Sequence, residues 1–277
     1  MRYALLAALA FFAQSVHAQA GWPQREVKVL IGFSPGGTTD IVTRLVSADL
    51  ARAWGQPIVI ENRPGAGGNI AGELTARAKP DGYTLMMGSV GPLAINATLY
   101  RSIGYDNLKD LAPVTLVAHV PNMLVFAPRA LQAGTFQEFV ALLKANPGKY
   151  FYASTGSGTS SHLSGELLKL RAGIDITHVP YKGAVALNDV LSGESVHFMF
   201  ATIPSAIHHV RSGRLRALAE KISADLARVL AQPGMREKFV QQGADPVGST
   251  PQEFGEYMRA ETAKWAKLVK ASGATAE

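Results

Sequence analysis

Two short loops rich in glycine, serine and threonine carry the residue types best suited to holding an anion. The first, GFSPGGTTD at residues 32–40, follows the apolar run 27–31 and precedes a helix-periodic run at 41–54. The second, STGSGTSS at residues 154–161, lies between a strand-like run and a helix start in the same way. A helix that begins after such a loop leaves its first N–H groups without intrahelical partners, and its dipole favours a negative group there. Two such corners, one in each half of the chain, predict a carboxylate held between two lobes.

Hydroxyl groups near both loops supply further hydrogen-bond donors. A hydrogen bond to a charged partner contributes about 1.5–3 kcal/mol. Three or four of them, less the cost of ordering, predict roughly −8 kcal/mol and micromolar binding. The alternative is that both loops are only turns and helix caps. The hydroxyls in question belong to Ser34, Thr38, Thr39, Ser89, Thr155, Ser157, Thr159 and Ser160.

Neither loop matches a nucleotide-binding motif. Gly32 and Gly37 have the spacing of a phosphate loop, but Thr38 stands where that motif requires a lysine. Gly156 and Gly158 begin a dinucleotide fingerprint whose third glycine is absent. The sequence therefore disfavours a nucleotide site.

The same residues do not form a recognisable catalytic arrangement. The chain contains no Gly-x-Ser-x-Gly motif. Ser160, His162 and Glu166 lie together at one helix start, where they cannot align as nucleophile, base and orienting group, so a capped helix is the preferred interpretation. His208 and His209 are adjacent, which makes them a poor pair of metal ligands, and the chain has no cysteine. We therefore expect a binding protein with no catalytic residue, no cofactor and no metal, and rank an enzyme third.

The N-terminal residues have the form of a secretory signal peptide. Arg2 precedes an apolar run at 3–13, and Val-His-Ala at 16–18 offers a small-x-small cleavage site. We expect a signal peptide at 1–18, cleaved after Ala18 or Ala20, and an exported, periplasmic protein; the alternative is an uncleaved membrane anchor. No later segment approaches the length of a membrane-spanning helix.

The net charge of +6 is spread over the chain. Lysines and arginines occur singly, without a basic run or interleaved aromatic residues, although they outnumber the acidic residues by 27 to 21. We expect a solvated surface and no nucleic-acid partner.

From residue 27 onward, strand-like and helix-periodic runs alternate as in βαβ units, which predicts an α/β protein. Two strand-like runs at 111–120 and 123–127 suggest a crossing into a second lobe that repeats the alternation. We expect a two-lobe fold in which each lobe is a mostly parallel sheet flanked by helices. The first lobe is assigned to residues 22–118 and 221–277, and the second to 119–220.

One junction departs from this pattern. The strand predicted at 214–219 runs into a helix at Lys221 with no turn residue between them. Such connections usually take about 2–6 residues, so either the strand ends early or a segment is missing.

Several stretches spread over most of the chain resemble the Bug (TctC-like) periplasmic solute-binding receptors of the tripartite tricarboxylate transporter family. The matching residues are GFSPGGTTD at 32–40, ENRPGAGG at 61–68, KPDGYTL at 79–85, GTSSHL at 158–163, VPYKG at 179–183, FMF at 198–200, SGRLRALA at 212–219 and GADPVGSTP at 243–251.

The resemblance implies a periplasmic-binding-protein (Venus-flytrap) fold with a small carboxylate in the cleft between the lobes. It also implies delivery of that ligand to membrane transporter subunits, by a receptor we expect to be monomeric. Carried over to this chain, the ligand-binding residues are Pro35, Gly36, Gly37, Thr38, Thr39, Asp40, Ser89, Ser157, Gly158, Thr159, Ser160, His162, Ala201 and Thr202. Of these, Asp40 is interpreted more as a first-turn cap than as a ligand contact.

The chain departs from the family at the same junction that lacks turn residues. Family members continue after the LRALA strand through a few dozen further residues, whereas here Glu220 joins Lys221 directly. The sequence thus predicts an internal deletion near Glu220. The alternative function is a receptor-derived regulatory or defunct protein that lost transport binding through this deletion.

Overall fold

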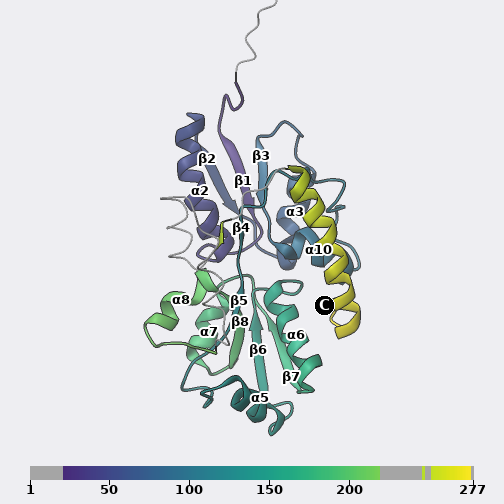
Figure 1. Cartoon of the computed structure of the whole chain (residues 1–277). Coiled ribbons are helices and arrows are strands. Elements are labelled where there is room, and N and C mark those ends of the chain that lie inside the picture. Colours follow the sequence, from purple (N-terminus) through teal and green to yellow (C-terminus); the bar gives the residue numbers. More distant parts are fainter. Residues whose placement is uncertain (1–20, 219–244, 247–250, 276–277) are drawn as a thin grey trace, which may run out of the picture.

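The structure is a computed structural model that describes residues 21–218, 245–246 and 251–275. Within this part the chain forms two α/β lobes, one above the other, and the C-terminal helix runs along one side of both (Figure 1). The predicted signal peptide at 1–18 and the junction at Glu220 lie outside the described residues. The same holds for most of the tail before residue 251.

The first lobe is built on a three-stranded parallel sheet in the order β2-β1-β3. Each strand leads into helical turns, as the alternation in the sequence predicts. In the central strand, Val27 and Ile31 are completely buried. The elements are β1 (Val27–Ile31), α2 (Thr38–Trp54), β2 (Ile58–Asn62), η1 (Ala66–Gly68), α3 (Asn69–Ala76), β3 (Thr84–Met87), the π-helical turn η2 (Gly91–Ile95) and α4 (Asn96–Leu99).

The second lobe contains a five-stranded mixed sheet in the order β7-β6-β8-β5-β9. Strand β6 is parallel to β7 and β8, whereas β5 is antiparallel to β8 and β9. The elements are β5 (Asn122–Phe126), α5 (Phe136–Lys144), β6 (Tyr150–Ser154), α6 (Ser160–Ala172), β7 (Ile176–Pro180), α7 (Ala186–Ser192), β8 (Phe198–Thr202), α8 (Ile203–Arg211) and β9 (Arg216–Leu218).

Helices cover both faces of the second sheet. Because side chains alternate along a strand, Tyr152 and Phe198 point to the face that carries α5 and α6, where Phe139 is also completely buried. Their neighbours Ala153 and Met199 point to the other face, against α7 and α8. Burial on both faces is typical of a sheet with parallel strands.

Two features connect the lobes. Strand β4 (Ala118–His119) lies between them and pairs antiparallel with β10 (Asp245–Pro246). Helix α10 (Pro251–Ser272) packs on η2 and α4 of the first lobe and on α6 of the second. An apolar cluster joins these three parts of the chain and consists of Ile95, Leu99, Leu163 and Val269.

The strand predicted at 111–120 is much shorter than expected. Only Ala118 and His119 form a strand, and residues 112–117 have no regular structure. Pro113 offers no N–H group to a ladder, which explains why the apolar run does not extend a sheet.

Candidate functional site

The first glycine-rich loop connects β1 to α2, as predicted, and it lies against a second loop of the same lobe. A side chain at Gly32 would meet the backbone of Gly68 at 2.6 Å, so the two loops touch backbone to backbone. In the first loop, the Ser34 N–H donates to the carbonyl of Lys182 at 3.3 Å, which connects this loop to the second lobe.

Asp40 organises the start of α2. It is 4% exposed, and its carboxylate accepts from the Gly36 amide at 3.0 Å and from two nitrogens of Arg44 at 2.9 Å each. Asn62 donates to it at 3.2 Å and to the Phe33 carbonyl at 3.0 Å. Burial opposes ionisation, but the hydrogen bonds from Arg44, Gly36 and Asn62 outweigh it and lower the pKa of Asp40. The carboxylate thus fixes the loop and is fully engaged by the protein itself.

Replacing Asp40 with asparagine is expected to lower the free energy of unfolding by about 1–3 kcal/mol at pH 7, because charge-assisted hydrogen bonds to Arg44 and Gly36 are lost. Since the folded-state pKa is lowered, this contribution is present above the ordinary value of 3.8 and disappears as pH falls through the folded-state pKa. Urea unfolding at pH 7 and at pH 3 measures both effects. Asp49→Asn is the control: Asp49 pairs with the exposed Arg52 on the same helix and should cost less than about 1 kcal/mol. Equal losses would contradict the role given to Asp40.

The second loop connects β6 to α6, again as predicted. Thr159 caps the helix, since its hydroxyl accepts from the His162 amide at 3.4 Å and donates to the Gly156 carbonyl at 2.7 Å. The Gly158 amide donates to Nδ1 of His162 at 3.2 Å. These contacts hold residues 156–159 in a compact turn just beyond the carboxyl end of β6.

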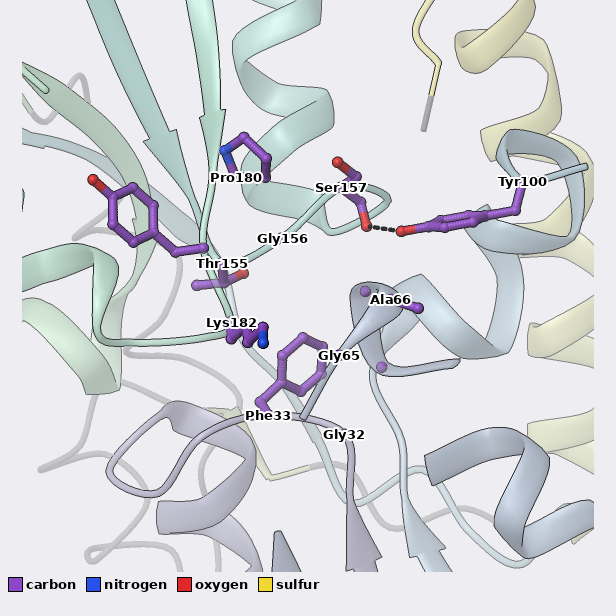
Figure 2. Close-up of a pocket in the computed structure, with 13 residues that line it drawn as sticks. Gly32, Phe33, Gly65, Ala66, Tyr100, Thr155, Gly156, Ser157, Pro180 and Lys182 are labelled. Atoms are coloured by element: carbon purple, nitrogen blue, oxygen red, sulfur yellow. Dashed lines mark hydrogen bonds between the residues drawn. The ribbon is translucent and has the colours of Figure 1, made fainter. Parts of the chain in front are cut away.

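A cavity of about 240 Å³ lies between the two lobes. Figure 2 shows the loops of both lobes converging on it, with Tyr100 directed at Ser157 across the gap. The Tyr100 hydroxyl donates to the Ser157 carbonyl at 3.0 Å. The lining residues are Gly32, Phe33, Gly65, Ala66, Gly67, Gly68 and Tyr100 from the first lobe, and Thr155, Gly156, Ser157, Pro180, Tyr181 and Lys182 from the second.

The wall of this cavity offers donors that the protein does not use. Within the part of the chain that the structure describes, the amides of Phe33, Ala66, Gly67 and Ser157 have no acceptor. Likewise, Lys182 forms no ion pair with any described residue. Unpaired N–H groups and an ammonium group favour an anionic guest, while the rings of Phe33, Tyr100 and Tyr181 provide apolar surface beside them.

The loop at 65–68 has an unusual backbone. All four residues have positive φ, including Ala66 at 47°, the only such residue besides glycine in the described ranges. Glycine adopts positive φ readily, so the strain falls on Ala66, and strained residues of this kind concentrate at ligand sites. At Gly67 a methyl group would overlap the carbonyl oxygen of Ser157, so only glycine allows the lobes to approach here.

The fourteen residues expected to bind the ligand differ in their positions relative to the cavity. Ser157 lines the cavity. Thr38 and Thr202 meet across the lobes, with their hydroxyl oxygens 2.6 Å apart. Gly158 and Thr159 of the second loop and His162 just after it are buried and do not line the cavity. Pro35, Gly36, Gly37, Thr39, Asp40, Ser89, Ser160 and Ala201 are not among the residues that line the cavity.

Several lining residues were not among those expected. The glycine run at 65–68 and the Tyr-Lys pair at 181–182 belong to stretches that resemble the family, so a signal existed in the sequence. Tyr100 gave no such signal, because a tyrosine at the end of a short helix is common in protein cores. Its role depends on the distant partner Ser157.

One serine–histidine pair exists near the site. The Ser154 hydroxyl lies 2.7 Å from Nε2 of His178. Ser154 is completely buried and accepts the Gly156 amide at 3.1 Å, so its oxygen cannot reach a substrate. The described residues contain no group of three or more histidine, aspartate or glutamate side chains that could hold a metal, and no helix among them is long and apolar enough to cross a membrane.

Comparisons with known proteins identify relatives of this chain. The family profile described as "Tripartite tricarboxylate transporter family receptor" (TctC) matches residues 42–229. Protein BugT of Bordetella pertussis is 34% identical, with 91% of each chain covered. That alignment runs over 298 positions, more than the 277 residues of this chain, so at least 21 positions of BugT have no counterpart here.

Two solved structures with named ligands are similar over nearly the whole chain. A protein of R. palustris with adipate has a TM-score of 0.85 and 30% identity, covering 93% of this chain and all of that one. MatC of Rhodopseudomonas palustris with bound malate has a TM-score of 0.80 and 27% identity, covering 90% of this chain and all of that one. The two lobes therefore have the periplasmic-binding-protein fold, as the family resemblance implied.

Proposed function

The chain belongs to the tripartite tricarboxylate transporter receptor (TctC) family, a family of periplasmic solute-binding receptors, and on that premise we propose that it captures a small carboxylate in the cavity between its lobes. The observation that carries the proposal is the wall of that cavity. Both lobes contribute unused backbone amides, and Lys182 adds a positive charge. The adipate-bound and malate-bound relatives support a carboxylate as the ligand class.

Recognition by backbone amides explains how binding couples to closure. Phe33 and Gly67 belong to the first lobe and Ser157 to the second, so a carboxylate that accepts from both sides stabilises the closed arrangement. Contacts between the lobes add to this, since Thr38 meets Thr202 and Tyr100 meets Ser157. Binding and release then require only movement of the lobes, and no catalytic group takes part.

Delivery of the ligand to a membrane transporter depends on the same closure of the lobes. The ligand-bound receptor presents a surface made from both lobes, which a membrane transporter can distinguish from the open form. The protein acts in the periplasm after removal of the signal peptide at 1–18, and it works as a monomer.

The test is a calorimetric titration of the mature protein with mono-, di- and tricarboxylates, adipate and malate included, beside a thermal-shift screen. At least one carboxylate should bind with a Kd of about 1 μM or lower and raise the melting temperature. Adipamide, which has the length of adipate without its charge, is the matched control and should not bind. A protein that melts cooperatively but binds no carboxylate in the panel would overturn the proposal.

A further inference from the structure

A cluster of polar side chains contacts the backbone of the second loop. His162 on α6 is 3% exposed and stacks on His178 of β7, with ring centroids 4.1 Å apart. Ser154 at the end of β6 is completely buried beside them. None of the three lines the cavity.

This cluster holds the loop by its backbone. Nδ1 of His162 accepts the Gly158 amide at 3.2 Å, and the Ser154 hydroxyl accepts the Gly156 amide at 3.1 Å. His178 in turn fixes Ser154, through Nε2 at 2.7 Å from its oxygen. The two bound amides flank Ser157, whose carbonyl meets Tyr100 and whose amide faces no acceptor in the described residues. His162 thus acts on Ser157 through Gly158, and His178 acts on it through Ser154 and Gly156.

We propose that His162 and His178 are positioning residues of the ligand site, and that His162 holds Ser157 in place only while its ring is neutral. This inference rests on the proposed function, because it concerns the same cavity. A ring nitrogen accepts a hydrogen bond only when it carries no proton. Protonation of His162 at Nδ1 would turn the acceptor into a donor facing the Gly158 N–H, and the turn at 156–158 would lose its support.

The surroundings favour the neutral rings. Burial lowers the pKa of His162, and Lys169 adds to this effect while Glu166 opposes it. Burial, then His162 and Lys169, lower the pKa of His178 to about 3. Glu166 is itself engaged, since it accepts from the Tyr152 hydroxyl at 2.6 Å and pairs with Lys169 at 3.4 Å. On the remaining side, α4 and α10 meet α6 through the apolar contacts of Leu163.

Two substitutions of His162 distinguish the loss of the hydrogen-bond acceptor from the effect of protonation. Asparagine places an oxygen where Nδ1 lies and cannot be protonated, whereas leucine offers no acceptor. At pH 7.5 we expect His162→Asn to bind the carboxylate selected by the panel about as the wild type does, and His162→Leu to bind it about tenfold or more weakly, because a buried N–H is left unpaired. As pH falls below 6.5, the affinity of the wild type should fall relative to that of His162→Asn; protonation of the ligand affects both proteins equally.

His197→Leu is the matched control. Nδ1 of His197 also accepts a backbone amide, that of Phe151 at 3.1 Å, but this residue lies away from the cavity. Its loss should lower the melting temperature and leave the affinity unchanged. A second measurement needs no ligand: amide hydrogen exchange of residues 155–159 should be faster in His162→Leu than in His162→Asn or His197→Leu.

The outcomes are distinct. If the wild type binds no carboxylate, the proposed function fails, and the exchange of residues 155–159 still decides the positioning role. If His162→Leu binds as the wild type does with unchanged exchange, the inference is wrong. Should His162→Leu fail to fold, the pH profile of His162→Asn decides: parallel profiles for the two proteins overturn the role of the proton.

Discussion

Replacing Gly67 with alanine is expected to weaken carboxylate binding by at least about 100-fold, which corresponds to about 3 kcal/mol. Gly67 has a φ of 62°, which costs an alanine about 1–2 kcal/mol. The added methyl group would also overlap the carbonyl oxygen of Ser157 and lie 3.2 Å from the Tyr100 hydroxyl. Overpacking of this kind typically costs about 1–3 kcal/mol. Because Gly67 and Ser157 belong to opposite lobes, the cost of the overlap falls on closure of the lobes.

Calorimetry with the carboxylate that the wild type binds measures this loss. Gly55→Ala is the matched control, since Gly55 has a φ of 64° and no heavy atom within 4 Å of the added carbon. That variant bears the same backbone strain at the end of α2, so it should lose stability and keep its affinity. If the two variants bound the ligand equally well, closure through Gly67 would not be required for binding.

Much of the fold can be predicted from local patterns. Alternating strand-like and helix-periodic runs indicate βαβ units because each pattern describes a face that must be buried. Thr135 and Glu138 have the spacing of a capping box, which predicts a helix start. The structure confirms it: the Thr135 hydroxyl accepts the Glu138 amide at 3.1 Å and α5 begins there. The apolar run at 111–117 shows the limit, since its composition favours a strand but residues 112–117 have no regular secondary structure.

The candidate site is less accessible to such reasoning. The two glycine-rich corners are recognisable because a strand, a loop and a helix start follow one another in sequence, and the structure places both beside one cavity. The contact of Thr38 with Thr202 joins residues 164 positions apart, and no local pattern indicates which hydroxyls meet. His162 illustrates the same point. The family resemblance implies that it binds the ligand, but only the fold shows that its ring accepts the Gly158 amide and does not line the cavity.

The largest loss of stability is expected from Phe139→Ala, at about 3–5 kcal/mol in the free energy of unfolding. Phe139 on α5 is completely buried and lies edge-on to Phe198 of β8, with centroids 5.0 Å apart, and stacked on Phe126 of β5 at 6.0 Å. Removing the ring leaves a cavity among side chains from three elements, which cannot close without moving the sheet. Urea unfolding at pH 7 measures the change.

Phe136→Ala is the control that distinguishes the cost of the Phe139 cavity from the cost of losing any aromatic ring on α5. Phe136 begins the same helix and stacks on Phe139 at 6.4 Å, but it is only half-buried, so its loss should cost clearly less.

The comparison also bears on the site, because β8 carries Thr202 at its end and β6, next to it, leads into the second loop. If the Phe139 cavity loosens the sheet, Phe139→Ala should bind a carboxylate more weakly than Phe136→Ala does, and the ligand should then add less to its stability. Equal destabilisation by the two substitutions would contradict the placement of Phe139 at the centre of the second lobe.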